Sequence, residues 1–522
     1  MTPLTPGPNP MAVYTAPPTL PKLDEFYTTH KAILDRAVQA MHEKTFHAQY
    51  PEHPKAYAAD GMQTGQAAYE AQLNQPFTRL KQQGEPTHRG EISPYTQEPL
   101  GIQYPSLSDP AAYVTNAQES LAAWRETSPE QRAGLLIESL ERMKEHFYEI
   151  AFATQHTTGQ GFMMSFQASG PHAADRALEA VALGYDELTR QPREVVWEKP
   201  MGKFVAKMNK YYKPVPKGVA LAIGVSTFPI WNSVPGIYAS LITGNPVIIK
   251  PHPGAIYPLA IVAGLLQETL ADAGLPTEIV QLATDTVDAP LTKHLAEHPL
   301  VKVIDFTGGN AFGDYIETLP GKVTFTEKAG VNSVIIDSTT DLQKMAQNLA
   351  FSVSLYSGQM CTCPQNFFVP KDGIDVNGEK KSFAEVAQAL AGAIQGLVGN
   401  EKAGPAVGGA IQNPATAKRA KATESKGKKV WLESQPIANP EFPKALTASP
   451  GLVEVGPEQR DLFGEETFGP VLYIIPTENT LHSLTLAREL AQRKVPSRAR
   501  PTPPTPRPWS KSPKAWPKPP PA

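Results

Sequence analysis

The sequence predicts an α/β protein whose central part is a doubly wound parallel sheet, followed by a second α/β portion from about Val334–Asp337. From Gly218 onward, short apolar runs alternate with segments of helical periodicity, which is typical of parallel sheets covered by helices on both faces. The predicted strands are Val219–Val225, Val247–Ile249, Ile279–Ala283 and Val301–Phe306. The predicted helices between them are Ser233–Ile242, Tyr257–Ala273 and Ala289–Glu297. Because such sheets bind ligands beyond the carboxyl ends of their strands, we expect functional residues there.

Length, composition and charge are ordinary for a globular protein. The 522 residues are enough for two or three domains, with 41% hydrophobic and 19% charged residues. A formal net charge of −3 argues against nucleic acid or an anionic membrane as the main partner. No apolar run approaches the roughly 18 residues of a membrane span, and Met1–Pro21 has no signal-peptide pattern. Together with the presence of only two cysteines, these features predict a cytoplasmic protein.

The N-terminal part divides into a tail and an extension. Residues 1–22 are rich in Pro and Thr, which predicts a disordered tail. A helix is predicted from about Leu23, because apolar side chains from Phe26 to Met41 recur at helical spacing. We expect residues 23–85 to form an extension that packs on the core.

A helix start and an apolar cluster follow. In Ser128-Pro129-Glu130-Gln131, Ser caps the helix, Pro takes its first position and Gln completes a capping box, so we expect a helix to about Ala153. After a break comes an apolar cluster that fits a substrate tunnel and a core patch equally well. Its members are Phe162, Met163, Met164 and Phe166.

The only two cysteines lie in one short stretch, Tyr356–Cys363. Cys361 and Cys363 are too close in sequence to form a relaxed disulfide, and two thiolates leave about two ligands of a metal site to be found elsewhere. A nucleophile is the remaining interpretation, because Gly358 lets backbone approach a substrate and the following N–H groups can face an oxyanion. No metal site is predicted.

The motifs around this stretch resemble those of the aldehyde dehydrogenase superfamily. Thr326-Glu327-Lys328-Ala329-Gly330 precedes Gly358-Gln359-Met360-Cys361 in the family's order. Three further motifs have counterparts in GNPVIIKP (244–251), FTGGNAFG (306–313) and ETFGP (466–470). The resemblance implies an aldehyde dehydrogenase-like fold, with an NAD(P)-binding domain at 86–330 and a catalytic domain at 331–490.

For the reaction, the resemblance implies that Cys361 is the nucleophile and Glu327 the general base. The family's oxyanion-binding Asn aligns with Thr227 in Ser226-Thr227-Phe228-Pro229, so Thr227 is the expected oxyanion donor. Asn232 could take that role only if the backbone shifts. Family members that pass the acyl group to coenzyme A usually lack the Glu, so its presence predicts hydrolysis to a carboxylic acid.

For the cofactor, the resemblance implies a set of residues that bind NAD or NADP. They are Lys250 at the adenosine ribose, Gly308, Gly309 and Gly313 at the dinucleotide backbone, and Glu466 and Phe468 at the nicotinamide. Relatives often carry a Glu on the adenosine ribose where this chain has Pro253. Because a carboxylate there would repel a 2′-phosphate, Pro253 predicts that NADP is accepted at least as well as NAD.

Finer motifs resemble the PaaN-type proteins of phenylacetate degradation. They are His156–Gln160, Gly170-Pro171-His172, Lys250–Pro253 and Gly358–Thr362. This resemblance implies a semialdehyde substrate formed by opening the phenylacetyl-CoA-derived ring, with a CoA-linked aldehyde as one form of it.

The C-terminal segment, residues 491–522, departs from the family. From Arg498 to Ala522 it is basic and saturated with Pro, so it cannot form helix or sheet ladders. It is either a Pro-rich binding tail or the product of a reading-frame change that replaces the family's ending. With an intact ending we expect a homo-oligomer. With this one, the alternative to an enzyme is a non-catalytic scaffold, although an intact Cys361 and Glu327 argue against a decayed site.

Overall fold

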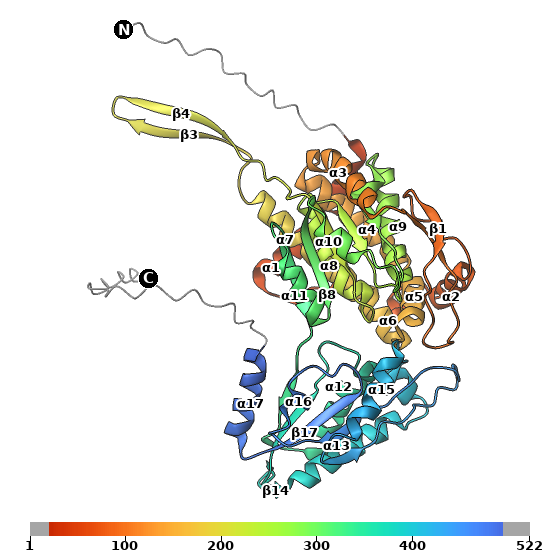
Figure 1. The fold of residues 1–522 in the computed structure, drawn as a ribbon. Coiled ribbons are helices and arrows are strands. Elements are labelled where there is room, and N and C mark those ends of the chain that lie inside the picture. The colour runs from red at the N-terminus through yellow and green to blue at the C-terminus, as the bar shows by residue number, and fades with distance from the viewer. Residues whose placement is uncertain (1–19, 494–522) are drawn as a thin grey trace.

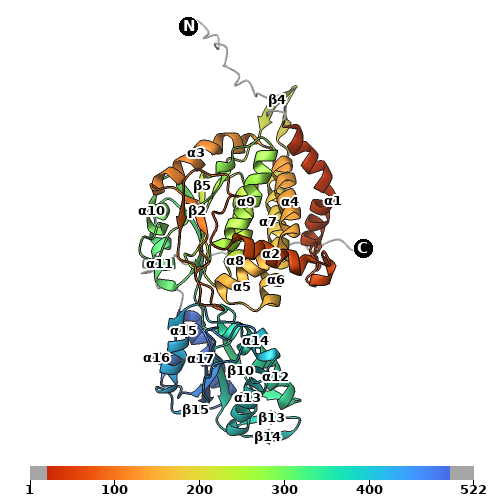
Figure 2. The same cartoon turned by 90° about the vertical axis from the view of Figure 1, so that its right-hand side faces the viewer.

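The computed structural model describes residues 20–493 and forms two lobes (Figures 1 and 2). Residues 20–328, coloured red to green, form the upper lobe, and the remaining described residues form the lower one. The predicted tail at 1–22 and the Pro-rich segment at 491–522 fall almost wholly outside the described residues. Among residues 20–493, no helix combines the length and the apolar character that crossing a membrane requires.

The upper lobe is built on an all-parallel five-stranded sheet in the order β7-β6-β5-β8-β9. Its strands are β5 (Val219–Ile223), β6 (Val247–Lys250), β7 (Val280–Leu282), β8 (Val301–Gly308) and β9 (Val323–Lys328). The four predicted strands are therefore confirmed, and β9 is added after them. The chain moves outward from β5 to β7 and then returns to β8, so the strand order reverses between β5 and β8. That gap is the usual ligand-binding position in a doubly wound sheet.

Strands β5, β6 and β7 of this sheet are buried on both faces, as the strand composition predicts. On β5, Ala220 and Ala222 join one core cluster, whereas Val219, Leu221 and Ile223 join the opposite one. The helices of the first cluster are α1 (Pro21–Glu43), α4 (Pro129–Glu145), α5 (Phe147–Thr158), α6 (Phe162–Ser169), α7 (Pro171–Thr189), α8 (Pro229–Ile242) and α9 (Tyr257–Asp272). Those of the second are α3 (Pro110–Glu126), α10 (Thr292–Glu297) and α11 (Asn310–Thr318).

The capping box predicted at Ser128 is present, but the helix it starts is shorter than expected. The Ser128 hydroxyl accepts from the backbone N–H of Gln131, and the Gln131 side chain accepts from the N–H of Ser128. The expectation of one helix to Ala153 is wrong, because α4 ends at Glu145 and α5 restarts after His146. The apolar spacing continues in phase across this break, which is why periodicity alone does not reveal it.

The N-terminal extension packs on the first helical layer. Phe26 and Leu34 of α1 are buried in the same core as α4, and α2 (Gly61–Gln72) lies against α5. Gly61 and Gly65 make that contact close, since a Cβ at either position would collide with Tyr148. Two short strands, β1 (Glu85–His88) and β2 (Gln103–Ser106), follow the extension.

The lower lobe contains a second five-stranded sheet in the order β10-β12-β17-β16-β15. Its strands are β10 (Ser333–Ile335), β12 (Asn366–Pro370), β15 (Lys429–Leu432), β16 (Gly451–Glu454) and β17 (Val471–Thr477). Only β15 pairs antiparallel within this sheet, so the predicted second α/β portion is confirmed. Its helices are α12 (Leu342–Ser354), α13 (Phe383–Val398), α14 (Ala403–Gly408), α15 (Pro414–Glu424), α16 (Arg460–Phe463) and α17 (Thr480–Arg493). A small sheet is formed by β11 (Ser338–Thr339), β13 (Ile374–Val376) and β14 (Glu379–Lys381).

A long hairpin projects from the upper lobe, away from the rest of the chain (Figure 1). It consists of β3 (Glu194–Met201) and β4 (Phe204–Tyr211), which among residues 20–493 pair with each other and with no further strand. Large apolar side chains are exposed along it, and Phe204 is 63% and Val196 55% accessible.

Candidate active site

A cavity of about 260 Å³ opens where the strand order of the upper sheet reverses. Residues 225–228 after β5 and residues 307–309 at the end of β8 form one side of it. Glu327, near the end of β9, and Cys361, from the lower lobe, also line it. The cavity thus collects strand-end residues of one lobe and loop residues of the other, as the fold predicts.

Seven of the predicted site residues line this one cavity. They are Thr227, Gly308, Gly309, Glu327, Cys361, Glu466 and Phe468. Lys250, Pro253 and Gly313 do not line it. Motifs that are dispersed over the sequence therefore converge on a single site.

The turn before Cys361 has an unusual backbone. Tyr356 and Ser357 have φ values of 53° and 49°, and Gly358 follows with 69°, so two non-glycine residues adopt the left-handed region. Such conformations are strained and persist only where the surroundings hold them. The Tyr356 hydroxyl donates to the carbonyl of Thr158 at 2.5 Å, and the Ser357 hydroxyl donates to the carbonyl of Gly408 at 2.9 Å. These buried bonds, one of them to the upper lobe, hold the cysteine loop in place.

Asn332, a residue without any sequence motif, fixes the cysteine loop from the other side. Its side-chain amide donates to the carbonyls of Cys361 at 2.7 Å and Cys363 at 3.1 Å. Both bonds leave the Cys361 side chain free to face the cavity. The role of Asn332 could not be predicted from the sequence, because its hydrogen bonds join segments that are about 30 residues apart.

The two thiols differ in their surroundings. Burial raises the pKa of Cys361, and the charge of Glu327 and a hydrogen bond to it raise the pKa further. Burial, followed by the charge of Glu466, raises the pKa of Cys363 to about 12. Cys361 lines the cavity together with Glu327, whereas Cys363 does not line it.

Glu327 is held from α8. The side-chain amide of Asn232 donates to Glu327 Oε2 at 3.1 Å. Asn232 therefore orients the carboxylate, a contact that differs from the oxyanion role considered for it above. The carbonyl of Thr227 accepts from Gln160, at 2.7 Å, and Gln412 donates to the carbonyl of Ser226 at 3.0 Å. Two amide side chains, one of them fully buried, thereby fix the loop that carries Thr227.

The glycines of the second motif lie between β8 and α11. Gly309 is the N-cap residue of α11, and a Cβ added there would meet nothing within 4 Å. Open space beside the first N–H groups of a helix suits the approach of a phosphate. At Gly313 the absence of a side chain serves packing instead, since a Cβ there would collide with the Lys328 side chain. The upper side of the cavity therefore fits a dinucleotide.

Lys250 is buried at the end of β6 and forms an ion pair that the sequence did not reveal. Its Nζ lies 2.7 Å from Asp285 Oδ1, and the two side chains are 3% and 1% accessible. Burial lowers the pKa of Lys250, and Asp285 opposes that shift. Pro253 lies in the turn after β6, outside the cavity. The negative charge of Asp285 therefore partly compensates the positive charge of Lys250 at the end of β6.

The loop with Glu466 and Phe468 is positioned by Gln365. The Gln365 side chain accepts from the N–H of Thr467 at 2.5 Å and donates to the carbonyl of Glu465 at 3.1 Å. A Cβ at Gly358 would collide with the carbonyl of Gly469, so this loop also packs directly on the turn before the cysteine.

The apolar cluster at 162–166 does not form a tunnel to Cys361, because none of its members lines the cavity. Phe166 is fully buried and packs on Tyr148, with ring centroids 4.9 Å apart. Met163 is 49% exposed. Of the two interpretations, the core patch is correct for Phe166.

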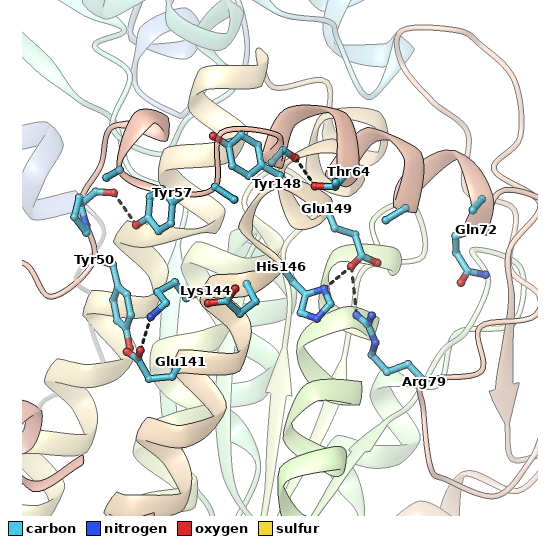
Figure 3. Close-up of a pocket in the computed structure, with 18 of the residues that line it drawn as sticks. Tyr50, Tyr57, Thr64, Gln72, Arg79, Glu141, Lys144, His146, Tyr148 and Glu149 are labelled. Atoms are coloured by element: carbon cyan, nitrogen blue, oxygen red, sulfur yellow. Dashed lines mark hydrogen bonds and ion pairs between the residues drawn. The ribbon is translucent and has the colours of Figure 1, made fainter. Parts of the chain in front are cut away.

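A larger cavity of about 780 Å³ lies elsewhere, between the N-terminal extension and the junction of α4 and α5 (Figure 3). Several of its charged side chains are already paired with one another. Glu149 Oε2 lies 2.7 Å from His146 Nδ1 and 3.5 Å from Arg79, and Lys144 contacts Glu141 at 2.6 Å. Since none of the predicted site residues lines it, size alone does not make it the active site. Within residues 20–493, no three His, Cys, Asp or Glu side chains gather as a metal site would require.

Comparison with known proteins gives a consistent picture. The profile of the Aldehyde dehydrogenase family matches residues 81–490. The crystal structure of an NAD-dependent aldehyde dehydrogenase from Burkholderia multivorans is 44% identical, with a TM-score of 0.86 over 89% of this chain and 84% of that one. A 1-pyrroline-5-carboxylate dehydrogenase of Bacillus subtilis is 25% identical over 411 residues, which cover 76% of this chain and 74% of the relative. An NADP-dependent glyceraldehyde-3-phosphate dehydrogenase from Bacillus halodurans, complexed with NADP, shares the fold, with 22% identity and a TM-score of 0.58 over 78% of this chain and 84% of that one.

Proposed function

Since the chain belongs to the aldehyde dehydrogenase family, we propose that it oxidises an aldehyde to a carboxylic acid with NAD or NADP, through a thioester on Cys361. The observation that carries this proposal is the placement of Cys361, Glu327, Asn232 and Thr227 around one cavity. A nucleophile, a base and hydrogen-bond donors at one point are the parts that acyl chemistry needs.

The residues divide the reaction between them. Cys361 gives up its proton, and its sulfur attacks the aldehyde carbon to form a thiohemiacetal. The oxyanion that develops is stabilised by the backbone N–H of Cys361 and by the side chain of Thr227. A bound dinucleotide would supply a hydride acceptor for the substrate carbon, and loss of that hydride would leave the acyl group on the sulfur of Cys361 as a thioester. Glu327, oriented by Asn232, then takes a proton from water that attacks the thioester.

The dinucleotide would be held by Gly308 and Gly309 at the start of α11, with Glu466 and Phe468 across the cavity. Lys250 would contact the adenosine ribose from the end of β6. The Burkholderia relative is described as NAD-dependent and the Bacillus halodurans one is complexed with NADP. We propose that this chain uses either cofactor.

The substrate we propose is a semialdehyde formed by opening the phenylacetyl-CoA-derived ring, free or CoA-linked, acted on in the cytoplasm. Its support is the resemblance of the segments around His156, His172 and His252 to PaaN-type proteins. The His172 ring packs on Trp231, with ring centroids 6.0 Å apart, and Trp231 precedes Asn232 on α8.

The test of this function is product analysis with the full chain. Purified protein is incubated with ring-opened semialdehydes and with simple aliphatic aldehydes, with NAD or NADP, in the presence and absence of coenzyme A. We expect NAD(P)H and free carboxylic acid in equal amounts, with no dependence on coenzyme A. An acyl-CoA product would contradict the hydrolytic role of Glu327, and absence of any turnover would favour the scaffold alternative.

The cofactor preference is expected to be weak. Pro253 neither binds the ribose hydroxyls nor repels a 2′-phosphate, and Asp285 partly compensates the charge of Lys250. We therefore expect NADP to bind at least as tightly as NAD. Fluorescence titration with both cofactors measures this, and Pro253→Glu should shift the preference toward NAD. Wild-type binding of NAD about tenfold tighter than that of NADP, a difference of about 1.4 kcal/mol, would contradict the expectation.

The hairpin β3–β4 is where we propose that a second copy of the chain binds. A hairpin that pairs with nothing else is marginally stable in water, and its exposed apolar side chains call for a partner. Phe204→Lys combined with Met208→Lys should lower the mass measured by light scattering to that of one chain. Phe46→Lys, at an 89% exposed position outside the hairpin, should leave the mass unchanged. Equal masses for all variants would contradict this assignment.

A further inference from the structure

Asp305 is a carboxylate beside the active site to which the mechanism above gives no role. It lies half-buried on β8, in the row Val303, Asp305 and Thr307 that faces α8. Within residues 20–493, its carboxylate has neither a hydrogen-bond donor nor an ion-pair partner. A carboxylate in this state is unusual next to a buried helix, since burial without a partner costs free energy.

The register of the sheet brings Asp305 close to Glu327. β8 and β9 are parallel, with Thr307 opposite Glu327 and Asp305 opposite Phe325. Side chains two residues apart on a strand point to the same face, so Asp305, Thr307 and Glu327 share one face. Asp305 and Glu327 are diagonal neighbours there, a separation that side chains of this length can bridge. Thr307 and Glu327 line the cavity, whereas Asp305, two residues before Thr307 on β8, does not.

Helix α8 packs over this face of the sheet and contacts the carboxylates of both Glu327 and Asp305. Asn232 donates to Glu327, and Gly236, one turn later on the same helix face, covers Asp305. A Cβ at Gly236 would collide with the Asp305 carboxylate, so glycine at this position leaves the room that the carboxylate occupies. One face of α8 therefore contacts both carboxylates, Glu327 at the cavity through Asn232 and Asp305 next to it through Gly236.

We propose that Asp305 receives the proton that Glu327 takes from the attacking water, directly or through one solvent molecule, and so restores Glu327 as a base. This inference rests on the proposed function. The water oxygen bonds to the thioester carbon, one water proton goes to Glu327, and the carbon–sulfur bond breaks with its electron pair on Cys361. The other water proton leaves with the product acid, and the proton on Glu327 passes to Asp305 and then to solvent. No oxidant or further reactant is required for this step.

The electrostatics of Asp305 suit a proton acceptor that works near neutral pH. Burial, followed by the charge of Glu327, raises the pKa of Asp305 to about 6. Glu327 is the titratable group that β9 brings to it, whereas Ala222 on β5 and the α8 residues Asn232 and Gly236 do not titrate. Above pH 6 Asp305 is ionised and can accept a proton, and as the pH falls through 6 it becomes protonated and the relay stops.

The experiment compares wild type with Asp305→Asn, which keeps the shape and removes the proton acceptor. The first NAD(P)H burst reports acylation, and steady-state turnover from pH 5 to 8 reports hydrolysis. At pH 7.5 we expect an unchanged burst and a turnover about 10-fold lower, a smaller loss than the roughly 10²–10⁴-fold effect of a general base itself. Wild type is expected to lose turnover below pH 6, and this loss should disappear in the variant.

The controls separate the relay from folding and from the proposed function. The control is Asp272→Asn. Asp272 is the last residue of α9, and its exposed carboxylate pairs with Arg142 of α4. This variant should match wild type in both the NAD(P)H burst and the turnover–pH profile. If Asp305→Asn does not fold, Asp305→Ser supplies the same comparison. A turnover–pH profile identical to wild type would overturn the relay while leaving the function intact. A wild-type enzyme without any NAD(P)H burst would overturn the function itself.

Discussion

Replacing Cys361 with alanine is expected to abolish aldehyde oxidation, whereas Cys363→Ala retains most of it. Cys361 lines the cavity beside Glu327, where its thiolate can reach an aldehyde. Cys363 lies outside the cavity, its sulfur is 3.6 Å from the Pro364 carbonyl, and burial keeps its thiol protonated at neutral pH. Steady-state formation of NAD(P)H measures the difference.

Each cysteine variant is the matched control of the other, since both remove one thiol from the same loop. Cys363 packs at the edge of a core cluster, so Cys363→Ala is expected to cost about 1 kcal/mol of stability through the lost burial. Thermal unfolding of both proteins separates that cost from a catalytic effect. An inactive but folded Cys363→Ala beside an active Cys361→Ala would reverse the assignment of the nucleophile.

Glu327→Gln is expected to lower turnover by about 10²–10⁴-fold while a burst of NAD(P)H remains. The variant keeps a hydrogen-bonding group beside Asn232 but loses the base that takes a proton from water. The thioester should therefore form and accumulate on Cys361. Rapid mixing followed by mass analysis of the trapped acyl-enzyme measures both outcomes.

The same variant should make Cys361 more acidic. The charge of Glu327, and its hydrogen bond to the thiol, both raise the pKa of Cys361, so removing them lets the thiolate form at lower pH. The rate of alkylation by iodoacetamide, measured against pH in a Cys363→Ala background, should rise at a lower pH in Glu327→Gln than in its parent. Loss of the burst with slower alkylation would mean that Glu327 is needed to deprotonate the thiol.

The sequence by itself determined the fold class, four of the five strands of the upper sheet and seven of the residues that line the cavity. Each of these is encoded locally. Val247–Lys250 is a short apolar run between turns, and the Ser128 capping box needs only four consecutive residues. The motif residues Glu327 and Cys361 are recognisable because short sequence patterns surround them. Such signals do not depend on knowing which segments meet.

Only the tertiary structure decided which side chains support those residues. The break at His146, the pairing of Lys250 with Asp285 and the contact of Asn232 with Glu327 leave no local pattern. Asp305 looks like one polar residue within a strand until the register of β8 and β9 places it diagonally opposite Glu327. These contacts join residues from separate strands, helices and lobes, and their partners are set by how the sheet is wound and how α8 packs over it. A hydrogen bond or a close packing contact needs positions accurate to a fraction of an ångström, which folding of the whole chain supplies and periodicity does not.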